Sequence, residues 1–150
     1  MPADMGYMHH MEVHMHGDSP MPANKGFGEA PLRWMAEVRQ GIDVGIVDAV
    51  LADGRLSAVE LDRLALPRKT LMHRRTMGRL SPEQSDRLLR ILRVIEEAEA
   101  TFGDRDKAHL WLRRPTPLFA DQAPLDLLDT DIGVRQVEAL LGRIAHGIAA

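Results

Sequence analysis

The chain has 150 residues, of which 45% are hydrophobic and 27% are charged, and its formal net charge is -3. This composition is typical of one or two small, water-facing domains. The absence of cysteine excludes a disulfide framework, a thiolate metal site and a cysteine nucleophile. No stretch approaches about 18 uninterrupted apolar residues, and the first residues lack the basic start and apolar run of a signal peptide. We therefore expect a cytoplasmic protein without a membrane span.

The first 30 residues are rich in methionine and histidine and are punctuated by glycine and proline. We expect residues 1–30 to form a flexible arm, because no apolar period survives there beyond a few residues. Thioether and imidazole groups at this density could hold a soft ion such as Cu(I). A flexible segment lacks the preformed geometry and supporting hydrogen bonds of a selective site, so we predict no metal site.

From Pro31 onward the pattern predicts an all-α fold, because no segment shows sustained alternation with a period of two. Each expected helix has apolar residues at three- and four-residue steps and a start or stop signal at its ends. The expected helices cover residues 31–40, 44–51, 58–65, 68–77, 82–102 and 104–114, followed by a short helical turn at 124–128 and a last helix from about residue 130.

Two of these helices begin with a capping box, in which the first side chains and the backbone satisfy one another. Ser57 pairs with Glu60 in the first box, and Ser81 pairs with Gln84 in the second. Gly103 is placed to end the longest helix. The helix over 58–65 has an expected apolar face made of Val59, Leu61, Leu64 and Leu66.

The charge is unevenly distributed along the chain. Residues 1–66 hold 5 basic against 10 acidic side chains, residues 67–93 hold 8 against 2, and residues 94–150 hold 6 against 10. A basic island in an acidic chain is the footprint expected of a surface that contacts a polyanion. A solvated helix face whose cations are balanced by nearby acids remains the alternative.

The two short helices at 58–65 and 68–77, with a tight turn at Leu66-Pro67, form a candidate helix-turn-helix. The second helix is basic, and its early residues point away from Leu71, which anchors it. Arginine suits DNA contact because its guanidinium makes paired hydrogen bonds to guanine or phosphate. The same geometry also occurs in bundles that never touch DNA. The candidate DNA-contacting residues are Arg68, Lys69, Met72, His73, Arg75 and Arg79.

Side chains for catalysis are sparse. His73, His109 and His146 fall on three different helices, and the sequence holds no Gly-x-Ser-x-Gly elbow, no His-Glu-x-x-His motif and no glycine-rich phosphate loop. We therefore predict that the protein is not an enzyme and needs no cofactor. The C-terminal part must bury two helices and a proline-rich loop with few large side chains, and leftover apolar surface on such a module marks a partner interface.

Two blocks of motifs, one in each half of the chain, carry a resemblance to a known protein family. The C-terminal block holds Phe102-Gly103-Asp104, Trp111-Leu112, Pro124-Leu125-Asp126-Leu127-Leu128, Leu141-Gly142-Arg143-Ile144 and His146-Gly147. It resembles the toxin-binding domain of Xre/MbcA/ParS-type antitoxins. The upstream block holds Thr70-Leu71, Arg74-Arg75, Gly78-Arg79-Leu80-Ser81 and Ser85-Asp86-Arg87-Leu88. It resembles the Xre-like helix-turn-helix of the same family.

The resemblance implies a helix-turn-helix domain over residues 31–102 that represses its own operon as a homodimer. It also implies a domain over residues 103–150 that neutralises a RES-domain toxin, an enzyme that consumes NAD or transfers ADP-ribose from it. In the family the C-terminal end of the antitoxin lies over the NAD pocket of the toxin. The toxin-contacting residues nominated here are Trp111, Leu125, Leu128, Arg143, His146, Gly147, Ile148, Ala149 and Ala150.

The sequence departs from the family in three places. Ala123 stands where the family often has Thr or Ser, the loop Phe119-Ala120-Asp121 is less glycine-rich, and the arm over residues 1–30 has no counterpart. Two other functions remain open. The protein could be a transcriptional regulator whose C-terminal module only dimerises or senses a ligand, or an antitoxin whose DNA function is vestigial.

Overall fold

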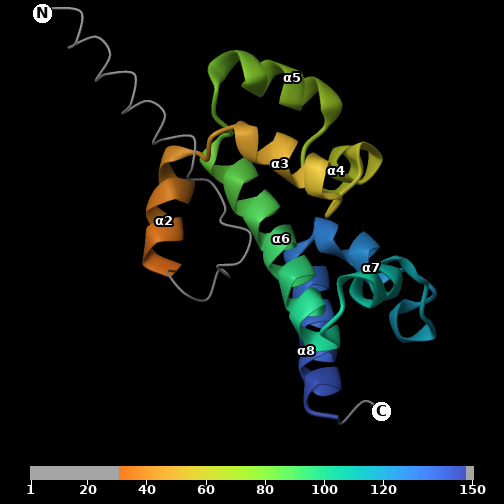
Figure 1. Cartoon of the computed structure of the whole chain (residues 1–150). Helices are drawn as coiled ribbons and strands as arrows, with labels where there is room; N and C mark the ends of the chain where they lie inside the picture. The colour runs from red at the N-terminus through yellow and green to blue at the C-terminus, as the bar shows by residue number, and fades with distance from the viewer. Residues whose placement is uncertain (1–30, 148–150) are drawn as a thin grey trace, which may run out of the picture.

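The structure, a computed structural model, describes residues 31–147 (Figure 1), so the expected arm over residues 1–30 lies outside the described residues. Within the described range the regular structure is helical, with only isolated bridges outside the helices, which confirms the all-α prediction. No described helix combines the length and the apolar character needed to cross a bilayer. The α-helices are α2 (Pro31–Gln40), α3 (Gly45–Asp53), α4 (Ala58–Leu64), α5 (Arg68–Met77), α6 (Pro82–Phe102), α7 (Arg105–Arg113) and α8 (Asp131–Ala145), with 3-10 helices η1 (Pro117–Phe119) and η2 (Pro124–Asp129).

The long helix α6 forms the axis of the molecule (Figure 1). α2 lies along one side of it, α7 and α8 pack against it, and α3, α4 and α5 gather near its N-terminal end. One continuous hydrophobic core reaches from Trp34 on α2 to Leu141 on α8. The side chains that α6 buries in this core are Leu88, Leu89, Ile91, Leu92, Val94, Ile95 and Ala98.

The predicted helix signals are confirmed by the local geometry. Ser57 and Ser81 each accept a hydrogen bond from the third helical N–H, while Glu60 and Gln84 return the bond in both capping boxes. Gly103 follows α6 in the left-handed conformation, with φ of 63°, which glycine adopts without the steric cost of a β-carbon.

η2 and α8 approach each other at the level of the backbone. A β-carbon on Gly133, in the first turn of α8, would collide with the carbonyl oxygen of Leu127. The side chain of Thr130 caps α8 by accepting the N–H of Gly133 at 3.0 Å. Ala123, in contrast, caps η2 without any side-chain hydrogen bond, so the cap missing from the sequence is also missing from the structure.

The prediction that Val59 belongs to the buried face of its helix is wrong. Val59 is 72% exposed, whereas Leu61, Leu64 and Leu66 are buried. The physical reason is the helical period, because two residues subtend about 200° around a helix and place Val59 nearly opposite Leu61.

Candidate nucleic-acid interface and partner surface

Helix α5 is the most exposed helix of the candidate nucleic-acid interface and buries none of its residues. Leu71 is only partly buried and is the side chain with which α5 packs on the core. Met72 and Met77 are 63% and 57% exposed. The helix therefore presents most of its side chains outward, in the arrangement needed to enter a groove of DNA.

The ends of α5 are fixed by hydrogen bonds from the neighbouring segments. At its start, the carboxylate of Asp62 on α4 accepts the backbone N–H of Arg68 at 2.6 Å. At its end, Gly78 adopts the left-handed conformation and its carbonyl accepts the N–H of Val44 at 3.0 Å. The role of Asp62 was not predicted from the sequence, although an acidic residue is favoured near the positive end of a helix.

The predicted DNA-contacting residues divide into two groups. Arg68, Lys69, Met72 and His73 are exposed in the first half of α5. Arg75 and Arg79 already have partners in the fold, because Arg75 donates to Asp48 at 2.9 and 3.2 Å, and Arg79 donates from Nη1 to the carbonyl of Gly41 at 2.7 Å.

Asp48 is a residue of this surface that the sequence pattern did not reveal. The hydrogen bond from Arg75 lowers the pKa of the Asp48 carboxyl below its usual value; slight burial acts in the opposite direction, and the positive charge of Arg75 adds to the lowering. The carboxylate is therefore ionised at neutral pH and holds the guanidinium of Arg75 against α3. A contact between Arg75 and a phosphate has to replace this ion pair.

The end of α8 forms the candidate partner surface. Arg143, His146 and Gly147 are exposed. Gly147 has φ of 73°, so it ends the helix as its position in the sequence predicts. The nominated residues Ile148, Ala149 and Ala150 lie outside the described residues.

The remaining nominated residues lie deeper. Leu125 and Leu128 are each 1% exposed, because η2 turns both side chains into the core. Direct contact between these leucines and a partner does not fit the described conformation, in which they support the surface from within. Trp111 is partly buried and packs on Phe102, with ring centroids 5.4 Å apart. Leu110, which is not among the nominated residues, is instead 62% exposed.

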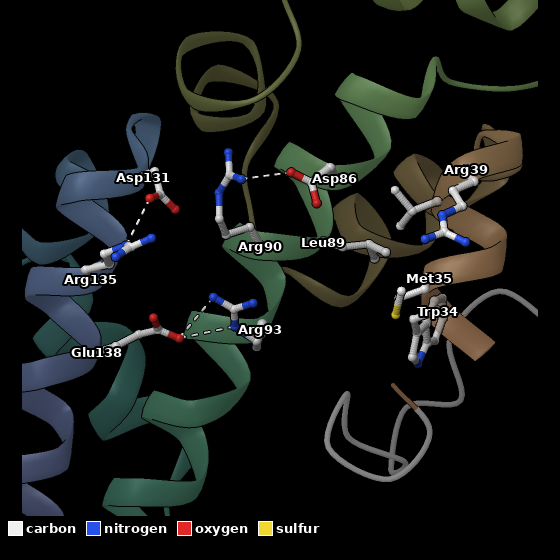
Figure 2. Close-up of a pocket in the computed structure, with 11 residues that line it drawn as sticks. Trp34, Met35, Arg39, Asp86, Leu89, Arg90, Arg93, Asp131, Arg135 and Glu138 are labelled. Atoms are coloured by element: carbon white, nitrogen blue, oxygen red, sulfur yellow. Dashed lines mark hydrogen bonds and ion pairs between the residues drawn. The ribbon is translucent and has the colours of Figure 1, made fainter. Parts of the chain in front are cut away.

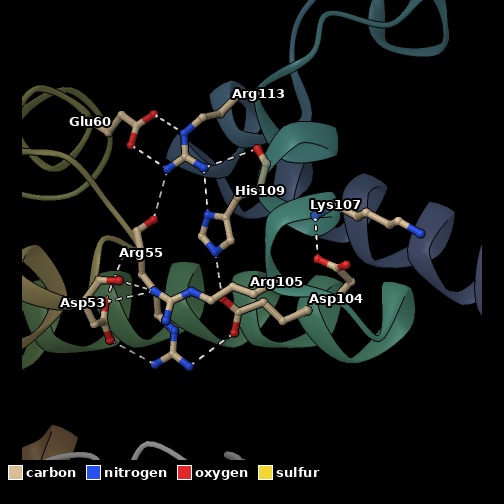
Figure 3. A network of polar contacts seen from close by, with 9 residues as sticks. Asp53, Arg55, Glu60, Asp104, Arg105, Lys107, His109 and Arg113 are labelled. Carbon is tan, nitrogen blue, oxygen red and sulfur yellow. Dashed lines mark hydrogen bonds and ion pairs between the residues drawn. The ribbon is translucent and has the colours of Figure 1, made fainter.

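A network of ion pairs joins the two halves of the chain (Figure 3). Glu99 on α6 accepts from Arg55 at 3.2 Å and contacts Nε2 of His109 at 2.7 Å. Arg113 donates to Nδ1 of His109 at 2.8 Å. Because Nδ1 accepts this hydrogen bond, the ring hydrogen of His109 lies on Nε2, which faces Glu99. Arg113 also reaches Glu60 on α4.

Burial and charge compete at the carboxylates of this network. Burial acts to raise the pKa of Glu99, but the hydrogen bond from His109 and the charge of Arg55 outweigh it and leave the pKa below its usual value. At Glu60, burial is likewise outweighed, here by hydrogen bonds from Arg113 and Ser57, so that pKa is also lowered. Both side chains are therefore ionised anchors at neutral pH.

An open groove of about 700 Å³ lies between α2, α6 and α8 (Figure 2). Two of the ion pairs in its lining are Arg90 with Asp86 at 2.8 Å along α6 and Arg93 with Glu138 at 3.1 Å between α6 and α8. The groove is separate from α5 and from the end of α8. Among residues 31–147 there is no group of three or more His, Cys, Asp or Glu side chains placed to hold a metal ion.

The described residues thus form an all-helical structure around one continuous core, with an exposed basic helix-turn-helix and a helical C-terminal module. Comparison with known families gives the same division. The antitoxin Xre-like helix-turn-helix domain matches residues 33–93, and the antitoxin Xre/MbcA/ParS C-terminal toxin-binding domain matches residues 97–147. The two matches adjoin within α6, which runs through both parts.

Curated relatives carry the resemblance over most of the chain. Antitoxin Xre of Yersinia enterocolitica is 33% identical over 114 residues, which are 74% of this chain and 77% of the relative. Antitoxin Xre of Photorhabdus laumondii is 33% identical over 77% of this chain and 80% of its own length. Antitoxin Xre of Pseudomonas putida is 39% identical over 63% of this chain and 59% of its own length. The chain belongs to the Xre/MbcA/ParS antitoxin family.

Proposed function

We propose that this chain neutralises a RES-domain toxin and represses the operon from which both proteins are expressed. The observation that carries the proposal is the tandem of the two domains, with an exposed basic helix in the first and an exposed helix end in the second. The curated relatives are named as antitoxins rather than as enzymes, which supports a role in binding rather than in catalysis.

Toxin neutralisation is assigned to the end of the chain. α8 ends at an exposed, left-handed Gly147, and the sequence continues with three small or apolar residues. Residues 146–150 cover the NAD pocket of the toxin and exclude the substrate, with Arg143 contacting the rim. A plug of this kind needs no chemistry of its own, because blocking access to a pocket stops the reaction.

DNA binding is assigned to α5. Arg68, Lys69, Met72 and His73 are free to meet base edges or phosphates, and Arg75 joins them once it leaves Asp48. Two copies of the chain present two such helices to a pseudo-symmetric operator, in the manner of dimeric helix-turn-helix proteins.

Co-expression with the toxin encoded next to this chain tests the neutralising role. The full chain restores growth, and deletion of residues 146–150 abolishes the rescue. Arg114→Ala, an exposed change on the linker after α7, serves as the control and leaves rescue intact. Full rescue by the deleted chain would contradict the plug.

A reporter driven by the operon promoter tests repression separately. Lys69→Ala in α5 derepresses the reporter while growth rescue remains, because the exposed Lys69 has no structural partner among the described residues. A regulator that does not bind a toxin would repress the reporter without rescuing growth. An antitoxin with a vestigial DNA function would rescue growth without repressing.

A further inference from the structure

The groove between α2, α6 and α8 combines an apolar floor with a basic rim (Figure 2). Trp34 and Leu89 form buried parts of the floor, and Met35 is 45% exposed. A groove of this volume accommodates a ligand the size of a short peptide segment. Its surface is therefore suited to an occupant that has both apolar and acidic side chains.

The charges of the groove are not balanced within the described residues. Its lining includes four arginines against three carboxylates. Three arginines have carboxylate partners across or along the helices, whereas Arg39 makes no ion pair with a described residue. The buried Nε of Arg90 likewise has no hydrogen-bond acceptor in the described part of the chain. The guanidinium of Arg39 and Nε of Arg90 can therefore each donate a hydrogen bond to a carboxylate or carbonyl oxygen of an occupant.

The methionines at the start of the chain follow a helical period. Met1, Met5, Met8, Met11 and Met15 are separated by steps of four, three, three and four residues. On a helix these steps place all five side chains on one face. Methionine alone carries the period, which is why the segment as a whole has no apparent apolar pattern.

Acidic residues fall on the same side of that pattern. On a helix, Asp4 and Glu12 would flank the methionine face, while His10 and His14 would point the opposite way. Residues 1–30 hold four acidic side chains and one lysine, a net charge of -3 with neutral histidines. The segment thus has apolar and acidic side chains that complement the apolar floor and the excess arginine of the groove.

We propose that residues 1–15 dock as an amphipathic helix in the groove between α2, α6 and α8 of their own chain. The thioethers pack on Trp34, Met35 and Leu89, since methionine adapts to irregular apolar surfaces and contacts aromatic rings favourably. The carboxylates of the segment approach Arg39 and the partly exposed guanidinium of Arg90. The docked segment occupies neither α5 nor the end of α8, so the protein retains both binding surfaces.

The length of the connecting sequence favours docking within the same chain. Residues 16–30 contain six glycine, proline and serine residues, and a flexible linker of that length has an r.m.s. span of about 20 Å. The ten-residue helix α2, along which the linker has to turn back, is about 15 Å long. Because the span and the linker match, the effective concentration of the segment at its own groove is near its maximum.

Energy transfer within the full chain tests the proposal. Trp111→Phe leaves Trp34 as the one tryptophan of a chain that has two, and Gly6→Cys adds one cysteine to a chain that has none. A dansyl group on this cysteine is separated from Trp34 by about 30 Å in a random coil. Docking brings the two together, so we expect transfer well above that of the same chain in denaturant. Equal transfer in the two conditions would overturn the proposal.

Matched variants identify the contacts. Met8→Gln with Met15→Gln abolishes the excess transfer, whereas His10→Gln with His14→Gln on the opposite face preserves it. On the groove side, Arg39→Glu abolishes the excess and Arg114→Glu, outside the groove, does not. Insensitivity to both the methionine pair and Arg39 would contradict docking at this site.

A mixing experiment excludes a second copy as the occupant. Labelled chains in which Trp34→Phe and Trp111→Phe remove the donor are mixed with unlabelled chains that retain Trp34. We expect no transfer in this mixture, because the segment of each chain occupies its own groove. Transfer between chains would overturn the intramolecular proposal and assign the groove to a dimer contact.

Discussion

Arg113 holds both carboxylate oxygens of Glu60, with Nε and Nη2 each donating at 2.9 Å. The same Glu60 carboxylate accepts the backbone N–H of Ser57 at 2.9 Å and so completes the capping box of α4. A side chain from α7 in the toxin-binding part thereby stabilises the start of the helix-turn-helix. The Glu60 carboxylate therefore belongs both to the cap of α4 and to the contact between the two parts.

Arg113→Ala should lower the free energy of unfolding by about 1–3 kcal/mol, because it leaves the half-buried Glu60 and His109 without their donor. Urea unfolding of the two chains measures the change. A double-mutant cycle with Glu60→Gln should give a coupling energy of about 1 kcal/mol. Additive effects of the two substitutions would show that the pair contributes nothing beyond its separate members. Arg114→Ala, the exposed neighbour, should stay within about 0.5 kcal/mol of the parent.

Acid should weaken the contact between the two parts. The folded pKa values of Glu60 and Glu99 lie below the ordinary value of 4.5. Their stabilising contribution is fully present above that value and is lost as the pH falls through the lower folded pKa values, where the carboxylates take up protons. Urea unfolding between pH 7 and pH 3 should therefore show decreasing stability, and Glu99→Gln should be less stable at pH 7 with a shallower pH dependence. A slope as steep as that of the parent would remove Glu99 from the explanation.

Asp48 should compete with DNA for Arg75. Asp48→Ala frees the guanidinium and removes a negative charge beside α5, so we expect operator affinity to rise about twofold to tenfold. Arg75→Ala should weaken binding by about 1–3 kcal/mol if this side chain reads a base. Fluorescence anisotropy with an operator duplex at several salt concentrations measures both changes. Weaker binding by Asp48→Ala would mean that the ion pair orients α5 for DNA.

The loop after η1 should become more stable when one alanine is replaced by glycine. Ala120 and Asp121 both adopt left-handed backbone conformations, with φ of 55° and 64°. This conformation destabilises a residue with a β-carbon by about 1–2 kcal/mol. Glycine avoids this strain, but its greater freedom in the unfolded chain offsets part of the gain. Ala120→Gly should therefore raise stability by about 0.5–1 kcal/mol in thermal or urea unfolding. Ala139→Gly, on the exposed face of α8, should instead lower it by about 1 kcal/mol.

The sequence predicts those parts of the fold that depend on neighbouring residues. The capping residues Ser57 and Ser81, the terminating Gly103 and the proline after α7 act over a single turn, so the helix bounds follow from local chemistry alone. Val59 shows the limit of this reasoning, because a seven-residue helix offers too few periods to distinguish its buried face from a neighbouring apolar residue.

The contacts between distant segments could not be predicted in this way. Arg113 and Glu60 are 53 residues apart, and Arg75 and Asp48 are 27 residues apart, so no local spacing relates them. Leu125 and Leu128 are apolar residues of a short turn that suit either the core or a partner contact, and only the packing of η2 on α8 shows that they are buried. The exposure of the first residues of α5, in contrast, could be predicted, because Leu71 is the apolar residue that packs on the core and the residues around it point away.

Because α5 buries none of its residues, its outward side chains can be exchanged during evolution at little cost to the folded state. Under the proposed function, gene duplicates can therefore acquire new DNA sites while their C-terminal halves keep the same toxin-binding surface. Under the proposed function, divergence of DNA recognition and divergence of toxin binding are therefore separable, because they act on different surfaces of the molecule.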